Sequence, residues 1–247
     1  MQNKFSNNYP IINLYKKKSI TSKIVTQMLY GENFTILRRF GNWCKIKLHT
    51  DNYNGFIIKK KFAKPSKPTH KVSVLAANIY GKPSSKTKQN KKLTFSSKIY
   101  AKKKYGSFIK FENQWIRTKD LKPINYEDKN IFSKINLFKG KKYQWGGKNF
   151  NGLDCSALVQ LFFNFNNKFC PRNTKDQLNY FKKKIKLHNI KKNDLIFWKG
   201  HVAVAISKNN LMHAYGPFKK TVKMSISKTI NRIHKTANLK VLGIRRI

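Results

Sequence analysis

Residues 151–163, with the sequence NGLDCSALVQLFF, combine a cysteine with a strongly apolar stretch. Apolar side chains recur every three or four residues after Cys155, which predicts a helix whose buried face is formed by Leu158, Leu161, Phe162 and Phe165. Asp154 is a residue type that caps helix starts, and Gly152 supplies a turn before it. We therefore expect Cys155 to lie in the first turn of a helix.

The start of a helix favours a reactive thiol. Free backbone N–H groups and the helix dipole stabilise an anion there, so we expect the pKa of Cys155 to lie below its ordinary value. The same N–H groups could hold the oxyanion that forms when a thiolate attacks a carbonyl. An unpaired cysteine is also a common core residue, and this segment alone leaves a nucleophile and a packing residue equally open.

Two histidines on predicted neighbouring strands offer a base for this thiol. The apolar segments 194–200, 201–206 and 211–215 predict successive strands, with His201 at the start of the second and His213 within the third. One imidazole could accept the thiol proton while the other orients it. A tight turn between the strands places His213 opposite Val204 or Ala205, so contact between the two rings requires a bend or a bulge.

A zinc site is the competing interpretation of nearly the same side chains, namely Cys155, Cys170, His201 and His213. These residues lack the closely spaced ligand pairs that are typical of structural zinc. We therefore favour thiol chemistry, which requires no metal and no organic cofactor, and we regard Cys170 as a packing residue.

The chain is strongly basic. Its 247 residues include 54 Lys and Arg but only nine Asp and Glu, for a formal net charge of +45. Such a surface attracts polyanions, and a non-enzymatic basic module that binds them is one alternative function. The lysines are spread along the whole chain, and the sequence contains no nucleic-acid recognition motif, so we expect no specific nucleic-acid partner.

Cysteine use and hydropathy bear on the compartment. The three cysteines form no C-x-x-C pair, which favours a reducing environment over a disulfide framework. The N-terminus lacks the apolar core of a signal peptide, and no apolar run approaches the ~18 residues of a membrane-spanning helix. We expect a cytoplasmic protein without a transmembrane segment; export to the periplasm or cell wall is the alternative.

Short alternating segments in the first half predict two small all-β barrels. Expected strands are 24–29, 33–38 and 43–48 in the first, and 72–76, 99–102, 108–111 and 114–118 in the second, with the linker KPSKPTH at 64–70. Longer apolar stretches begin after residue 126. The predicted domains are therefore 8–66, 70–124 and 126–247.

The third domain resembles a known family. The segments YQWGGKNFNGLDCSALVQ, PRNTKDQ, NDLIFWKGHVAVAI and LMHAYG, in this order and spacing, resemble the NlpC/P60 cysteine peptidases, with Ala157 in place of the usual glycine. The resemblance implies a papain-like α+β fold. It also implies that Cys155 is the nucleophile, His201 the base and His213 the third polar residue. The resemblance thus implies that these side chains lie close together, which counting residues along the strands does not show.

The barrels extend this resemblance. TQMLYGENFTILRRFGNWCKIKL and DNYNGFI are similar to a bacterial SH3 domain, and residues 70–124 resemble a second, diverged one. Two such domains before an NlpC/P60 domain resemble the murein-peptide recycling enzymes of the dipeptidyl-peptidase VI type. This implies cleavage of the bond between γ-D-glutamate and a diamino acid, diaminopimelate or Lys, in murein peptides with a free N-terminal L-Ala. A cell-wall endopeptidase that acts on intact peptidoglycan is the alternative within the enzyme class.

Six substrate-binding residues are carried over from this resemblance: Glu32, Tyr53, Asp154, Ser156, Arg172 and Thr174. A free ammonium in a closed pocket needs carboxylates, for which Glu32 and Asp154 are candidates. A guanidinium fork such as that of Arg172 matches a substrate carboxylate. Glu32 as a turn residue and Tyr53 as a half-buried barrel aromatic are the open alternatives.

Overall fold

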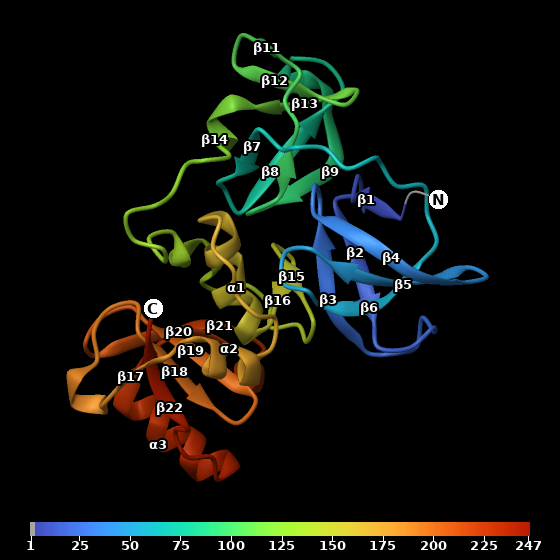
Figure 1. The fold of residues 1–247 in the computed structure, drawn as a ribbon. Coiled ribbons are helices and arrows are strands. Elements are labelled where there is room, and N and C mark those ends of the chain that lie inside the picture. The colour runs from blue at the N-terminus through green and yellow to red at the C-terminus, as the bar shows by residue number, and fades with distance from the viewer. Residues whose placement is uncertain (1–2) are drawn as a thin grey trace.

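In the computed structural model, which describes residues 3–247, two small β units precede a mixed α+β unit (Figure 1). The first unit is one six-stranded antiparallel sheet with the spatial order β1-β4-β5-β6-β2-β3. Its strands are β1 (Lys4–Ser6), β2 (Ile11–Tyr15), β3 (Ile24–Leu29), β4 (Asn33–Phe40), β5 (Trp43–Leu48) and β6 (Asn54–Ile58). The predictions for β3 and β5 are confirmed, and β4 continues two residues beyond its predicted end.

Strand β1 lies ahead of residue 8, the predicted start of the first barrel. It pairs with β4, and the Phe5 ring packs 5.9 Å from that of Phe34. Phe34 belongs to a core in which Leu14, Ile46 and Leu48 are also fully buried. Burial of Phe5 against this core explains why the barrel includes the extra strand.

The second unit contains a three-stranded sheet with the order β10-β7-β14 and a five-stranded sheet with the order β11-β12-β13-β8-β9. The strands are β7 (His70–Val72), β8 (Ala76–Tyr80), β9 (Lys88–Thr94), β10 (Lys98–Ile99), β11 (Lys103–Tyr105), β12 (Phe108–Phe111), β13 (Gln114–Arg117) and β14 (Leu121–Pro123). The predicted strands 72–76 and 99–102 are wrong. At both places the chain crosses from one sheet to the other, so neither segment stays in one ladder.

The third unit is built on a six-stranded antiparallel sheet with the order β17-β22-β18-β19-β20-β21. Its elements are β15 (Lys148–Asn149), β16 (Gly152–Leu153), α1 (Cys155–Phe165), α2 (Thr174–Tyr180), β17 (Lys183–Ile185), β18 (Leu195–Trp198), β19 (His201–Ala205), β20 (Asn210–Tyr215), β21 (Lys220–Ser225), α3 (Ile226–Ala237) and β22 (Gly243–Arg246). Short 3₁₀ turns occupy Ser85–Thr87, Thr118–Asp120, Ile135–Phe138, Leu187–Asn189 and Gly216–Phe218.

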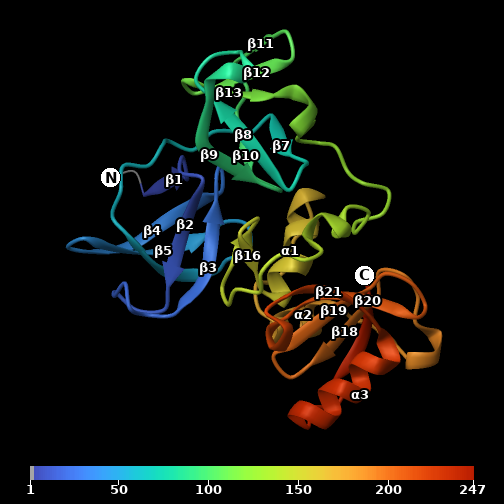
Figure 2. The same cartoon turned by 180° about the vertical axis from the view of Figure 1, so that it is seen from behind.

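Helices cover both faces of this sheet (Figure 2). One face packs on α1 through Val202, Val204 and Met212. The other packs on α3 through side chains that include Ala203 and Ile233. Successive side chains of β19 point to opposite faces of the sheet, so the apolar residues on each face are buried by a different helix.

Helix α1 forms for the predicted reasons. The carboxylate of Asp154 accepts a hydrogen bond from Ala157 N at 2.9 Å, which satisfies one of the free N–H groups of the first turn. Every side chain of the helix is buried. Cys155 is its first residue, as predicted, and the fold is the expected α+β class with small β barrels in front.

Both barrels contact the third unit. Gly146, with φ +71°, lies so close to the first barrel that a Cβ atom would sit 2.4 Å from the carbonyl oxygen of Ile24. From the second barrel, the Phe95 ring stacks on Phe165 at 4.6 Å. No helix within residues 3–247 combines the length and the apolar character needed to cross a membrane.

Candidate active site

Cys155 is only 6% exposed, with Sγ 4.0 Å from the carbonyl oxygen of Gly200. Burial raises the pKa of the Cys155 thiol to about 12, and the neighbouring Asp154 carboxylate raises it further. Hydrogen bonds from backbone N–H groups of Val202 and Ser156 act in the opposite direction but do not compensate. The predicted lowering of this pKa is therefore wrong, because loss of hydration outweighs the field of the helix start.

The two histidines are in direct contact. Nε2 of His201 and Nδ1 of His213 are 2.8 Å apart, so one of these nitrogens donates to the other. Val204 pairs with Met212, which places His213 opposite Ala203 rather than opposite Val204 or Ala205. His201 is then a diagonal neighbour on the same face, within reach of a long side chain. The predicted need for a bend or bulge is wrong.

Both imidazoles are uncharged near neutral pH. Burial lowers the pKa of His201 to about 4, and burial together with the charge of His201 lowers the pKa of His213 to about 2. Nε2 of His213 faces the sulfur of Met224 at 3.4 Å, and its ring stacks on Tyr215 at 4.6 Å. The bond to His213 occupies Nε2 of His201 and leaves Nδ1 as the second nitrogen of its ring. The resting pair is a neutral thiol and a neutral imidazole.

Asp154, Ser156 and Arg172 form one buried cluster beside the thiol. Arg172 donates from Nη1 and Nη2 to the two carboxylate oxygens of Asp154 at 2.9 and 2.6 Å, and Nη1 also donates to Ser156 Oγ at 2.8 Å. Its Nε donates to Thr26 Oγ1 of the first barrel at 2.7 Å. The guanidinium fork is thus occupied by Asp154, not open toward solvent as a substrate-carboxylate site would be.

Tyr53 and Thr174 lie at the edge of this cluster. Tyr53 makes a side-chain hydrogen bond with Asn173 and is close enough to Arg172 for that cation to lower its pKa, although burial raises the pKa overall. Thr174 is the half-buried first residue of α2. The fold therefore brings Tyr53 of the first barrel to the Asp154 and Arg172 cluster.

Glu32 is placed differently. Its carboxylate accepts two hydrogen bonds from Lys148 Nζ at 3.0 and 3.2 Å, one from Leu29 N at 2.6 Å and one from Thr50 Oγ1 at 3.3 Å. Lys148 is fully buried, and Glu32 is 4% exposed. The structure thus gives Glu32 an internal cation as its partner, where the sequence suggested a substrate ammonium.

Two further residues of the site are absent from the sequence-based set. Tyr143 is close enough to Cys155 and Asp154 that their charges, together with burial, raise the pKa of its phenol. Its place in the YQWGG segment is the signal that could have identified it. Thr26, the partner of Arg172, is a buried threonine in β3, and nothing in the local pattern singles it out.

Cys170, the fourth member of the zinc alternative, is fully buried and accepts a hydrogen bond from Gln177 Nε2 at 3.5 Å. Across residues 3–247, no three or more His, Cys, Asp or Glu side chains converge as metal ligands would.

Comparison with known proteins assigns two domains. Residues 140–241 match the NlpC/P60 family, and residues 14–61 match the bacterial dipeptidyl-peptidase SH3 domain. A structure of an NlpC/P60 family protein from Bacillus cereus superposes with a TM-score of 0.84 at 18% identity, over 98% of this chain and 99% of that one. This likeness extends the shared fold to the whole length of both chains.

Three curated relatives are similar in sequence. A probable endopeptidase NlpC homolog of Haemophilus influenzae is 38% identical over 91 residues, 35% of this chain, and the chain spans only 49% of that relative. The γ-D-glutamyl-L-lysine dipeptidyl-peptidase of Bacillus cereus is 25% identical, covering 78% of this chain and 68% of its own length. Dipeptidyl-peptidase 6 of Lysinibacillus sphaericus is 22% identical, covering 82% and 84%.

Proposed function

We propose, from the premise that this chain is a cysteine peptidase of the NlpC/P60 family, that it hydrolyses the γ-D-glutamyl to diamino acid bond of murein peptides with a free N-terminal L-Ala. The observation that carries the proposal is the hydrogen-bonded pair of His201 and His213 on the strands beside Cys155. Two relatives that align over most of this chain support the proposal: the name of one states a γ-D-glutamyl-L-lysine bond, and both are named dipeptidyl-peptidases.

The neutral resting pair indicates how the reaction begins. As Cys155 Sγ attacks the γ-glutamyl carbonyl carbon, Nδ1 of His201 takes the thiol proton, so a standing thiolate is not required. The oxyanion accepts hydrogen bonds from backbone N–H groups at the start of α1 and from the phenol of Tyr143, which stays protonated because its pKa is raised. His213 orients the imidazolium of His201 through their hydrogen bond.

The second half of the reaction reverses these proton transfers. His201 gives its proton to the leaving amine of the diamino acid, which departs as the C–N bond breaks and a thioester remains on Cys155. Water then attacks the thioester while Nδ1 of His201 accepts a proton from it. Return of that proton to sulfur releases the L-Ala-D-Glu carboxylate and restores the thiol.

The first barrel supports recognition of a short peptide with a free amine. Tyr53 of this barrel reaches the cluster formed by Asp154, Ser156 and Arg172, next to the nucleophile. We assign the ammonium of L-Ala to Asp154 and Tyr53, with Ser156 and Thr174 lining the same subsite. Glu32 joins this set only if substrate releases it from Lys148.

The test uses L-Ala-γ-D-Glu-meso-diaminopimelate, the corresponding L-Lys peptide and their N-acetyl forms. We expect release of L-Ala-D-Glu from the free-amine peptides only, and none with Cys155→Ala. Cleavage by Cys155→Ala at the wild-type rate would overturn the mechanism. Equal cleavage of the N-acetyl forms would favour a wall endopeptidase; the Haemophilus influenzae relative is named a probable endopeptidase.

We further propose the cytoplasm as the compartment, where the substrate would be imported wall fragments. All three cysteines are free and buried, which suits a reducing environment. Fractionation of cells with an antibody to the protein tests this. Recovery in the periplasmic or wall fraction would contradict it.

A further inference from the structure

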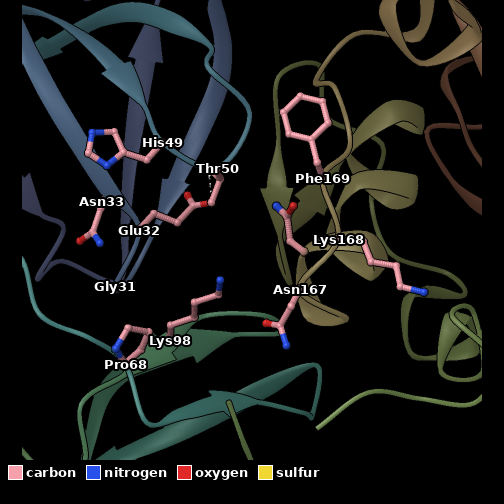
Figure 3. Close-up of a pocket in the computed structure, with 11 residues that line it drawn as sticks. Gly31, Glu32, Asn33, His49, Thr50, Pro68, Lys98, Asn167, Lys168 and Phe169 are labelled. Atoms are coloured by element: carbon pink, nitrogen blue, oxygen red, sulfur yellow. Dashed lines mark hydrogen bonds between the residues drawn. The ribbon is translucent and has the colours of Figure 1, made fainter. Parts of the chain in front are cut away.

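A cavity of about 400 Å³ lies where the three domains meet (Figure 3). The first barrel contributes Glu32 and Thr50, and the second contributes Lys98. The third, α+β unit, called the catalytic domain from here on, contributes Asn164 and Phe169. The lining differs entirely from the catalytic set of Cys155 and the two histidines. Binding sites for small molecules fall in this size range and occur preferentially at domain boundaries.

Two side-chain donors at this cavity lack a protein partner. Asn164, near the end of α1, is 7% exposed, and its Nδ2 has no hydrogen-bond partner within the part of the chain described. Lys98 directs its amine into the space between Glu32 and Asn167 (Figure 3) and belongs to none of the ion pairs of residues 3–247. A buried donor left unpaired costs about 1–3 kcal/mol, so a ligand that accepts from Asn164 Nδ2 and pairs with the Lys98 ammonium would be favoured.

The charge around the cavity favours an anion. The carboxylate of Glu32 is already neutralised by Lys148 and saturated with hydrogen bonds from Leu29 N and Thr50. The ammonium of Lys98 is then the unbalanced charge, partly desolvated, as the lowering of its pKa by burial shows. Desolvated cations bind carboxylates and phosphates more strongly than exposed ones do.

An unpaired hydrogen-bond acceptor at the same cavity restricts the chemistry of the ligand further. Oδ1 of Asn33 is buried without a partner in the described chain and lines the cavity with Glu32 and Lys98. It would accept a hydrogen bond from a ligand that carries a hydroxyl or an ammonium beside its anionic group.

We propose that this junction cavity binds a small carboxylate or phosphate that also carries a hydrogen-bond donor, held by Lys98 and Asn164. Because its walls come from both barrels and from α1, the bound anion clamps the barrels onto the helix that begins at Cys155. Its lining contains none of Cys155, His201 and His213, and it shares with the substrate-binding candidates only Glu32, whose carboxylate is occupied by Lys148.

The experiment titrates the full-length protein separately with inorganic phosphate and with L-glutamate, at ionic strength held constant with NaCl. Isothermal titration calorimetry measures affinity, and thermal unfolding measures stabilisation. We expect saturable binding of at least one probe with one site per chain. Lys98→Gln and Asn164→Asp should each weaken it about tenfold or more, the loss expected for one charge-assisted hydrogen bond. Lys91→Gln, which changes an exposed lysine of the same barrel, is the matched control and should bind like wild type.

The two probes separate the ligand chemistries. Saturable binding of phosphate alone assigns a phosphate site, and binding of L-glutamate alone assigns a carboxylate site. Phosphate also stabilises folded proteins without binding them, so an equal rise of Tm in wild type and both site variants would overturn the proposal. Absence of saturable heat with both probes would overturn it as well. Circular dichroism of each variant establishes that it is folded, and the two variants at different positions guard against a single folding defect.

Discussion

The two barrels hold the catalytic domain in different ways. The first uses directed polar contacts: Thr26 accepts from Arg172, Gln27 accepts from Lys148 N at 2.8 Å and from Asn149 Nδ2 at 2.7 Å, and Glu32 pairs with the Lys148 side chain. The second packs mainly through Phe95, whose ring lies 4.6 to 5.9 Å from three phenylalanine rings of the catalytic domain, those of Phe138, Phe162 and Phe165. Leu75 packs against the same core, and Lys71 Nζ lies 4.9 Å from the centroid of the Phe165 ring.

This difference indicates a division of roles. Hydrogen bonds and buried ion pairs stabilise only one geometry, so the first barrel determines where Arg172, and through it Asp154, sits beside Cys155. Burial of an aromatic ring is not directional and contributes mainly free energy. Variants of the first barrel should therefore change activity, whereas variants of Phe95 should change stability.

The largest expected effect is that of Phe95→Ala. Loss of a fully buried phenylalanine should lower the free energy of unfolding by about 3–5 kcal/mol, with kcat/KM of the folded protein nearly unchanged. Urea unfolding and a peptide-cleavage assay measure the two quantities. Tyr105→Ala removes a 62% exposed ring from the same barrel and should cost less than about 0.5 kcal/mol. Equal losses for the two variants would contradict the anchoring role of Phe95.

Breaking the buried ion pair should have the next largest effect. Lys148→Met leaves the Glu32 carboxylate buried without its cation and should cost about 3 kcal/mol of unfolding free energy. The double variant Glu32→Gln, Lys148→Met should recover most of this loss, because no buried charge remains. A double-mutant cycle by urea unfolding measures the coupling. A lower KM for the free-amine peptide in Lys148→Met would show instead that the released Glu32 binds the substrate ammonium.

A smaller effect is expected from Thr26→Val, which preserves the shape of the side chain but removes the acceptor for Arg172 Nε. The unfolding free energy should fall by about 1–3 kcal/mol, the cost of an unsatisfied buried donor. Because Arg172 orients Asp154 and Ser156, kcat/KM should fall as well. Thr21→Val, at an exposed position before β3, is the control. Unchanged kcat/KM in Thr26→Val would argue against a positioning role of the first barrel.

The smallest expected effect is a change of the unfolding free energy with pH, caused by the two buried histidines of the catalytic domain. His201 and His213 have pKa values of about 4 and about 2 in the folded state, below the ordinary 6.5, so the unfolded chain binds more protons at acidic pH. Their stabilising contribution is complete above pH 6.5 and is lost as pH falls, toward 4 for His201 and toward 2 for His213. Between pH 7 and pH 6 the loss should be under about 1 kcal/mol per histidine.

Urea unfolding at a series of pH values checks this prediction. His213→Asn should remove one of the two contributions and flatten the slope below pH 6.5. A slope that is the same in wild type and His213→Asn would show that other groups cause the pH dependence.

Local patterns in the sequence predict part of this structure well. Helix α1 with its Asp154 cap follows from apolar periodicity and capping chemistry, and β3 and β5 follow from alternation, because each depends only on neighbouring residues. The segments 72–76 and 99–102 fail, because apolar character alone does not show where the chain leaves one sheet for another.

The site itself is only partly predictable. Its candidate catalytic residues stand out by type and order, and the diagonal contact of His201 with His213 follows once the register of β19 and β20 is known. The partner of Arg172 does not stand out, because Thr26 lies 146 residues away along the chain. Nor does the partner of Glu32, since a carboxylate in a turn gives no sign of a lysine 116 residues later.

The sequence by itself determined the candidate residues for the chemistry: one cysteine at a capped helix start, two histidines on successive strands, and an arginine and carboxylates that could surround them. Only the tertiary structure decided their protonation and their partners. Hydration is removed by the whole surrounding fold, and burial reverses the expected pKa of Cys155 and keeps both imidazoles neutral. An ion pair likewise forms with whichever opposite charge the fold brings within reach, as Lys148 does for Glu32.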